Sequence, residues 1–282
     1  MCGIAGFYQS DQNYLSAGYH GTSPENPWRK RLIAMRQSLR SRGPNDENTL
    51  LFHHAGLAHT RLAIRDILGG KQPMSAQYRG RGASIVYNGE IYNTCELREE
   101  LKPFGMSWST TGDTEVILNG FLAMGTSFFE KLNGIFAFAI YVHQTKELYL
   151  VRDSLGVKPL FYSFDHTAVV FGSEPKALFA YGIHPAADRA CWNEIFSLGP
   201  ARTLGNGGFA GIHELLPGEY MHISASGCRH HFFRKLEAVP HHDSYTDTIR
   251  HVRFLLCDSI HRQMVSDIPI CSFLSGGLDS SL

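Results

Sequence analysis

The sequence of 282 residues lacks a net charge, because its 26 Lys and Arg residues balance 26 Asp and Glu residues. Without an excess of either sign, bulk charge gives no reason to expect a nucleic-acid partner or attachment to an anionic membrane. The chain has no apolar run near the roughly 20 residues that cross a bilayer. Its first residues also lack the basic region and apolar core of a signal peptide. We therefore expect a cytoplasmic protein with no nucleic-acid and no membrane partner.

Closely spaced cysteines are also missing. The six cysteines lie far apart and form no CxxC motif, which argues against a zinc ribbon and a thioredoxin-like redox site. They do not resemble the disulfide framework of a small secreted domain, so a reducing compartment is the simpler interpretation. Adjacent pairs among the 15 histidines lack the spacing of metal ligands, and we expect no histidine-based metal site.

Short apolar runs separated by turn residues are frequent in the first three quarters of the chain. Such runs, combined with stretches of helical period, predict an α+β sandwich of antiparallel sheets. Strands are expected at residues 2–8, 49–52, 56–59, 84–87, 136–141, 148–152, 160–162 and 168–171. Helices are expected at residues 29–40, 94–102, 114–124, 174–181 and 189–198, with Thr94 and Asp113 as candidate N-caps, and loops at 9–27 and 199–218.

The pattern changes after Asp243. Apolar residues recur every three or four positions from 245 to 264, which predicts one long amphipathic helix. Residues 268–274 then predict a buried strand that leads into a Gly-rich loop, the usual opening of a parallel α/β domain. A parallel strand needs neighbours, so we expect the chain to hold only the truncated start of this domain, with the next helix beyond Leu282. The expected organisation is a domain at 2–218, a linker at 219–242 and the second domain from 243.

Cys2 directly follows the initiator Met, and its small side chain permits removal of Met1. The new terminus would carry a thiol with an ordinary pKa of about 8.5 and an α-amine of about 7.7–8.0. One residue would then supply both a nucleophile and a base, as the N-terminal threonine of some hydrolases does. Taken alone, a cysteine at this position could be there by chance.

Six motifs occur along the chain in one order: MCGIAGF, RGPND, HTRLAI, YNGEIYN, TGDTEVIL and RDSLGVKPLFY. Together they resemble the class II glutamine amidotransferases, and among these the glutamine-hydrolysing asparagine synthetases. The resemblance covers roughly residues 2–218 and implies the Ntn-hydrolase αββα sandwich. We interpret Arg152, Asp153 and Lys158 of the last motif as structural support for the sheet and for a domain contact.

The resemblance assigns parts of a glutamine site to residues of this chain. Cys2 would attack the side-chain amide and form a γ-glutamyl thioester. The side-chain amide of Asn88 and the backbone N–H of Gly89 would form the oxyanion hole. The remaining glutamine contacts would be Arg61 on the α-carboxylate, Asp113 with Glu90 on the α-ammonium, and the backbone of Leu62, Ala63, Ile64 and Arg65. This half would need no cofactor.

Each assignment has a plainer alternative when it is considered alone. Asn-Gly is the commonest pair in hairpin turns, Asp113 could simply cap a helix, and an arginine at the end of a strand is usually solvated. The joint occurrence of the motifs favours the functional interpretation.

The second constellation follows the predicted strand at 268–274. Consecutive backbone N–H groups at glycines form a nest for an anion, and the loop resembles the SGGxDSS loop of ATP pyrophosphatases. The resemblance implies ATP binding by Leu274, Ser275, Gly276, Gly277, Asp279, Ser280 and Ser281, with Asp279 as a candidate Mg²⁺ ligand.

The whole enzyme implied by the resemblance would use glutamine, aspartate and ATP to make asparagine, and the family also allows a homodimer. Three alternatives stay open: an amidotransferase coupled to a sugar-phosphate domain, a β-lactam-synthetase-like ligase with another acceptor, and a non-catalytic scaffold. The Gly-rich loop argues against the first and Cys2 against the second.

Overall fold

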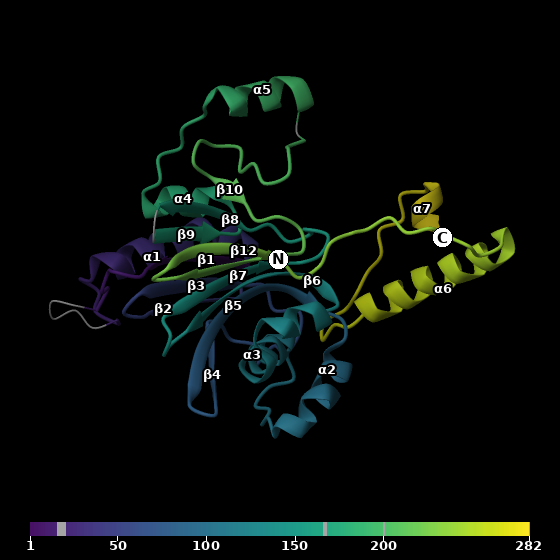
Figure 1. Ribbon diagram of the computed structural model, residues 1–282, viewed down its shortest axis with the longest axis horizontal. Coiled ribbons are helices and arrows are strands. Elements are labelled where there is room, and N and C mark those ends of the chain that lie inside the picture. The colour runs from purple at the N-terminus through teal and green to yellow at the C-terminus, as the bar shows by residue number, and fades with distance from the viewer. Residues whose placement is uncertain (16–20, 166–167, 200, 282) are drawn as a thin grey trace.

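The computed structural model describes residues 1–15, 21–165, 168–199 and 201–281. Two six-stranded antiparallel sheets dominate it (Figure 1). Sheet A has the order β10-β8-β9-β1-β3-β2 and sheet B the order β12-β11-β7-β6-β5-β4. The strands of sheet A are β1 (Gly3–Gln9), β2 (Asp46–Leu51), β3 (Ala55–Arg61), β8 (Phe161–Asp165), β9 (Ala168–Gly172) and β10 (His213–Glu214). Those of sheet B are β4 (Met74–Tyr78), β5 (Arg81–Ile91), β6 (Gly134–Val142), β7 (Glu147–Arg152), β11 (Glu219–Ser224) and β12 (Gly227–Phe232).

Helices cover the outer faces of both sheets, which gives the expected α+β sandwich with its αββα layers. Helices α1 (Pro27–Ser38) and α4 (Pro175–Tyr181) pack on sheet A, while α2 (Thr94–Leu101) and α3 (Asp113–Met124) pack on sheet B. Helix α5 (Arg189–Leu198) stands off the sandwich in Figure 1. The remaining helices are α6 (Tyr245–Gln263), α7 (Leu278–Ser281) and the 3-10 segments Arg40–Arg42, Lys102–Phe104 and Gly125–Lys131.

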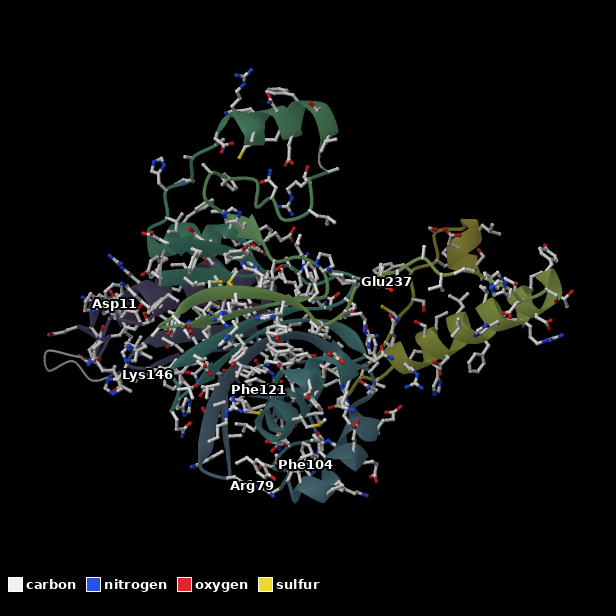
Figure 2. All side chains as sticks on the ribbon, in the orientation of Figure 1. Asp11, Arg79, Phe104, Phe121, Lys146 and Glu237 are labelled. Carbon is white, nitrogen blue, oxygen red and sulfur yellow. The ribbon has the colours of Figure 1, made fainter. Side chains whose placement is uncertain are left out.

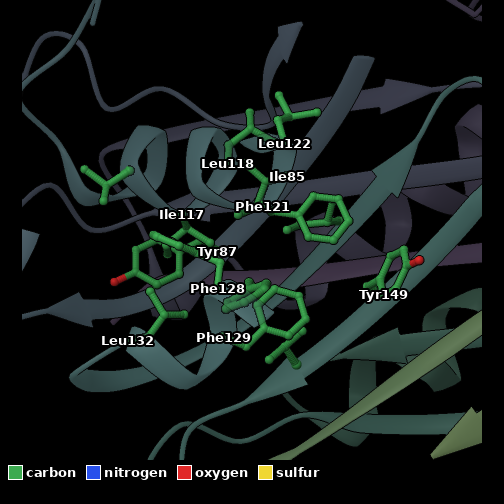
Figure 3. Packing of buried hydrophobic residues seen from close by; sticks show 14 of the residues in the cluster. Ile85, Tyr87, Ile117, Leu118, Phe121, Leu122, Phe128, Phe129, Leu132 and Tyr149 are labelled. Carbon is green, nitrogen blue, oxygen red and sulfur yellow. The ribbon is translucent and has the colours of Figure 1, made fainter. Parts of the chain in front are cut away.

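Alternation along each strand sends one set of side chains between the sheets and the other set toward the helices. On β5, Val86 joins the cluster between the sheets, whereas Ile85 and Tyr87 join the cluster under α3. The cluster under α3 is rich in aromatic rings (Figure 3), and the ring centroids of Phe121 and Tyr149 lie 5.1 Å apart. The cluster that contains Val86 packs the two sheets face to face, and Ile4, near the start of β1, belongs to it.

The expected elements of the sandwich are confirmed, with two kinds of difference. Helix α2 begins one residue after its N-cap Asn93 and α3 after Gly112, so Thr94 and Asp113 are first helical residues rather than caps. Strands β4, β10, β11 and β12 were not expected: β10 lies in the stretch predicted as a loop at 199–218, and β11 and β12 occupy residues 219–232, which were predicted as linker. Strand β11 pairs with β7, so this stretch is part of sheet B. Part of the loop predicted at 9–27 lies outside the described residues.

The C-terminal segment differs most from expectation. Helix α6 forms as predicted but has no buried residue, and Figure 2 shows its side chains standing away from those of the sandwich. Residues 268–274 form no strand, because no described strand lies beside them to complete a ladder. The helix expected beyond Leu282 begins within the chain, at Leu278. Among the described residues no helix is long and apolar enough to span a membrane, and all six cysteines are free thiols.

The turn after β7 depends on one buried carboxylate. Asp153 is 1% exposed. Its Oδ1 accepts the N–H groups of Leu155 and Val157, and its Oδ2 accepts those of Phe136 and Lys158. The guanidinium of Arg152 donates to the carbonyl oxygens of Gly156 and Lys158 in the same turn and to the carboxylate of Glu214. These bonds tie the turn after β7 to β6, which confirms the predicted role of this motif in supporting the sheet.

We expect Asp153→Asn to destabilise the fold by about 2–4 kcal/mol, because the new amide NH₂ would face backbone N–H donors that need an acceptor. Urea denaturation followed by circular dichroism measures the loss. The exposed residue Asp11 supplies the control, and Asp11→Asn should change stability by less than about 0.5 kcal/mol. Equal stabilities of the two variants would contradict this role of Asp153.

Candidate active site

A pocket opens where the start of β1, the end of β3, the middle of β5 and the N-terminus of α3 meet. About 370 Å³ of space lies within it, counting the part that is open to solvent. The lining residues come from five segments of the sequence: Cys2, Arg61, Leu62, Ile64, Arg65, Asp66, Gly70, Gln72, Tyr87, Gly89, Glu90, Gly112, Asp113 and Thr114.

Cys2 lies at the wall of this pocket, half-buried beside the residue that follows β3. The N–H of Leu62 points at Sγ at 3.4 Å, and the thiol lies 3.7 Å from the carbonyl oxygen of the same residue. Burial raises the pKa of the Cys2 thiol, while the N–H of Leu62 acts in the opposite direction. The chain carries its α-ammonium on Met1, where burial lowers the pKa of that group.

The backbone of Cys2 is held by Arg42. Arg42 Nε donates to the carbonyl oxygen of Cys2 at 2.9 Å, and Arg42 Nη1 donates to Glu174 Oε1 at 2.8 Å. Glu174 precedes α4, and Arg42 belongs to the RGPND motif, so two covering elements of sheet A converge on the first residues of β1. This arrangement fixes the direction in which the thiol points.

Arg61 is the last residue of β3 and is only 6% exposed. Its Nη1 donates to the carbonyl oxygen of Ile67 at 2.9 Å, and its Nη2 donates to those of Arg65 and Asp66 at 3.1 and 2.6 Å. These bonds use three of the five N–H groups of a guanidinium. Arg61 therefore shapes the loop at 62–70 from inside while it also lines the pocket, and it is not the solvated arginine of the plainer alternative.

Two carboxylates and one guanidinium face each other at the far side. Arg65 Nη1 lies 3.9 Å from both Glu90 Oε2 and Asp113 Oδ2. Asp113 also accepts hydrogen bonds from Tyr87 Oη at 2.8 Å and from the N–H of Ile91 at 3.1 Å. Burial raises the pKa of Asp113. Burial, with the charge of Asp113 added, raises the pKa of Glu90 to about 8. A further cation at this corner would favour the ionised form of both carboxyl groups.

Asn88 and Gly89 lie inside β5, paired with β6, and do not form the hairpin turn that the Asn-Gly pair can indicate. Gly89 lines the pocket. Asn88 is 1% exposed and its Nδ2 is a buried donor without a hydrogen-bond partner among the described residues. Asn88 lies two positions from Val86 and so shares its face, toward sheet A and the start of β1. A buried unpaired donor is costly, which makes Nδ2 a candidate partner for a ligand atom.

The structure brings most of the predicted site residues together. Ala63 and Asn88 are exceptions, because neither lines the pocket, and the N–H of Ala63 donates to Asn45 Oδ1. Lys158, interpreted as structural, reaches Met1 Sδ at 3.5 Å, and burial lowers its pKa. The sequence analysis missed the contacts of Tyr87 and Arg42, although both residues stand within motifs that it singled out. It also missed Gln72, whose side chain accepts the N–H of Tyr87 at 2.6 Å and donates to Thr114 Oγ1 at 3.2 Å.

The Gly-rich loop lies outside this pocket. Gly276 has φ +78°, the left-handed conformation that an anion nest uses. The N–H of Gly277 points at Ser275 Oγ, and Asp279 is exposed. The hydroxyls of Ser280 and Ser281 donate to the carbonyl oxygen of Gly277. No group of three or more His, Cys, Asp or Glu residues in the described ranges could hold a metal ion.

Comparison with known proteins agrees with this geometry. A family model described as a glutamine amidotransferase domain matches residues 1–234, and a second model, asparagine synthase, matches residues 251–282. The chain belongs to the glutamine amidotransferase domain family. The match extends past Phe232, in agreement with the place of β11 and β12 in sheet B.

Several relatives of the amidotransferase domain are known. The chain is 42% identical over its whole length to asparagine synthetase [glutamine-hydrolyzing] 3 of Bacillus subtilis and covers 44% of that protein. It is 33% identical, over 90% of its length, to asparagine synthetase B [glutamine-hydrolyzing] of Escherichia coli, of which it covers 41%. The chain thus spans less than half the length of these relatives.

Solved structures share the fold. The glutamine phosphoribosylpyrophosphate amidotransferase from B. subtilis aligns with 83% of this chain and 49% of its own, with a TM-score of 0.57 and 17% identity. A second structure, described as the allosteric regulatory enzyme of purine biosynthesis, gives a TM-score of 0.56 at 19% identity over 83% of this chain and 49% of its own. At these identities the likeness concerns the fold, which is that of the Ntn-hydrolase amidotransferases.

A ligand with an α-ammonium should release a proton from Glu90 when it binds. With a pKa of about 8, Glu90 is about nine-tenths protonated at pH 7, and a bound cation favours the ionised form. Glutamine should therefore bind more tightly as pH rises from about 6.5 to about 8. We would measure the release by titration calorimetry of the Cys2→Ala chain in phosphate and in Tris, whose heats of ionisation differ.

Glu90→Gln in the same Cys2→Ala background is the matched control. The buffer-dependent part of the heat should disappear in this variant, because Gln cannot release a proton. A heat that is independent of buffer in the parent chain would contradict the assignment of Glu90.

Proposed function

We propose that this chain hydrolyses the side-chain amide of glutamine to glutamate and ammonia, with Cys2 as the nucleophile. The observation that carries the proposal is the position of the Cys2 thiol at the wall of a pocket that also holds the carboxyl groups of Asp113 and Glu90 and the guanidinium groups of Arg61 and Arg65. A nucleophile at one end and groups for both charges of an α-amino acid at the other match the shape of glutamine.

The reaction would proceed in two steps. The Cys2 sulfur attacks the amide carbon, the C–N bond breaks, and the leaving nitrogen takes a proton and departs as ammonia. Water then attacks the γ-glutamyl thioester, which breaks the C–S bond and yields glutamate and the free thiol. Once Met1 is removed, the α-amine of Cys2 would carry the proton from sulfur to the leaving nitrogen.

The oxyanion of both steps needs donors where the negative charge develops. Asn88 Nδ2 is buried and unpaired in the described structure, and Gly89 supplies a backbone N–H at the pocket wall. One such donor typically lowers the barrier by about 3–4 kcal/mol. The two would act together, since both come from the same strand.

The two ends of the substrate would meet opposite charges. Arg61, with N–H groups beyond those used by the loop, would bind the α-carboxylate, supported by the backbone of Leu62 and Ile64. Asp113 and Glu90 would bind the α-ammonium and restore the balance of charge at Arg65. Tyr87 would keep the Asp113 carboxylate in position through its hydroxyl.

For the longer protein we propose asparagine synthesis from aspartate, with ammonia from this site and ATP bound at the Gly-rich loop. Support comes from the asparagine synthase match over residues 251–282 and from the relatives. Leu274, Ser275, Gly276, Gly277, Ser280 and Ser281 would hold the phosphates, and Asp279 would approach their Mg²⁺. When bound, ATP would activate a carboxylate for attack by ammonia. We place the boundary between the two parts after residue 234.

Cys2→Ala should reduce glutamine hydrolysis by at least about a thousandfold, while the thermal unfolding midpoint stays within ~2 °C of the parent, because the change is small and lies just before the start of β1. Released ammonia and glutamate are measured by coupled assays. A glutamine-analogue electrophile should label the parent and not the variant. Glutamate formation by the variant at the parent rate would refute the nucleophile, and a folded, Met1-processed parent without labelling would favour the scaffold alternative.

Retention of Met1 should also abolish hydrolysis, because the α-amine would lie one residue away from the thiol. Processed and unprocessed chains are prepared with and without methionine aminopeptidase, identified by mass, and assayed side by side. The unprocessed chain should stay folded, since it is the form in which β1 is already in place. Equal activity of the two forms would exclude the amine as the base.

A further inference from the structure

The loop at 62–70 is held from outside by the segment that follows α6. The carboxylate Oδ2 of Asp267 accepts the N–H of Asp66 at 2.6 Å, and the N–H of Asp267 donates to the carbonyl oxygen of Ile64 at 3.0 Å. The two partners are 201 positions apart in the sequence. We propose that Asp267 is a positioning residue for glutamine binding, an inference that rests on the proposed glutaminase function.

Asp66 has an uncommon backbone conformation that several hydrogen bonds hold in place. Its φ is +48°, an uncommon conformation for a residue with a side chain. Its carbonyl oxygen accepts from Arg61 and from the N–H of Gly70, and its carboxylate accepts the N–H groups of Gly69 and Gly112. With its N–H bound by Asp267, both backbone polar groups and the side chain of Asp66 are engaged, and the loop keeps the form that lines the pocket.

The segment that carries Asp267 is attached to the sandwich at a second point. Arg262, near the end of α6, donates to Glu96 of α2 at 2.8 Å and to Asp258 of its own helix at 2.9 Å. Exposed ion pairs contribute little by themselves, and α6 buries no residue. The paired hydrogen bonds of Asp267 are therefore the more directional of the two attachments, because a charged acceptor strengthens one of them.

The position of Asp267 also links two sites. Seven residues separate it from Ser275, the first residue of the Gly-rich loop. A displacement of the segment that carries Asp267 would alter its hydrogen bond with the N–H of Asp66. A change in the loop at 62–70 would alter the same hydrogen bond and so affect the segment, since coupling between two sites is reciprocal.

Loss of the contact should weaken binding rather than chemistry. If the loop samples other conformations when it is released, only a fraction of the free protein binds glutamine, and the apparent affinity falls by that fraction. Once glutamine is bound, Arg61 and Cys2 would have their usual positions. Asp267→Ala should thus raise KM for glutamine about three- to tenfold and leave kcat within about twofold.

The experiment compares three variants of the Met1-processed chain. Asp267→Ala removes the acceptor. Asp267→Asn keeps an oxygen that accepts from Asp66 and should return KM to within about twofold of the parent. Asp243→Ala is the control, an aspartate of the same C-terminal segment whose ion-pair partner is His251, and not the loop. Circular dichroism and thermal melting establish that each variant is folded.

Hydrogen exchange supplies a readout that does not depend on catalysis. The amides of residues 63–70 should exchange faster in Asp267→Ala than in the parent and the Asp243→Ala control. Unchanged exchange and KM in Asp267→Ala would overturn the proposal, as would a loss of kcat at constant KM or a failure of Asp267→Asn to rescue. Faster exchange in Asp267→Ala than in the parent, with no glutaminase activity in the parent itself, would instead support the contact and refute the proposed function.

Discussion

The site depends on one buried guanidinium. Arg61 leaves the end of β3 and binds three carbonyl oxygens of the loop that follows it. A buried charge is tolerated only where polar groups replace water, so the loop must curl around Arg61. The N–H of Leu62, next in the chain, then faces the sulfur of Cys2. The same interaction therefore shapes the pocket and places a donor at the nucleophile.

The sandwich supplies the rigid frame on which this loop acts. Strand β1 lies between β9 and β3 in sheet A, and β5 lies between β6 and β4 in sheet B. Central strands are fixed by ladders on both sides, which suits residues that must hold their geometry. Cys2 stands at the start of β1, while Asn88, Gly89 and Glu90 belong to β5. The end of β5 that carries these three residues is paired with β6 alone, since the ladder to β4 covers only Arg81 to Ile85.

Local patterns were sufficient for most of the sandwich and for the identity of the site residues. The period of apolar residues predicted α1 and α6, and the motifs predicted that Cys2, Arg61 and Asp113 would meet. Strand β12, at the edge of sheet B, was missed because charged and histidine residues occupy most of its exposed positions. Strand β11 does alternate between buried and half-buried residues, but only Met221 and Ile223 of its buried residues are apolar. The contact between Asp66 and Asp267 could not be predicted, because it joins backbone and side-chain groups 201 positions apart and leaves no period in the sequence.

The balance of charge in the pocket favours a zwitterion over either ion alone. The guanidinium of Arg61 has only neutral carbonyl partners among its described hydrogen bonds. Glu90 and Asp113, which line the same pocket, share Arg65. A simple amine would satisfy the carboxylates and leave Arg61 without a counter-charge, and a simple carboxylate would do the reverse. An α-amino acid supplies both charges on one carbon, so its side chain must extend along the remaining direction, toward Cys2.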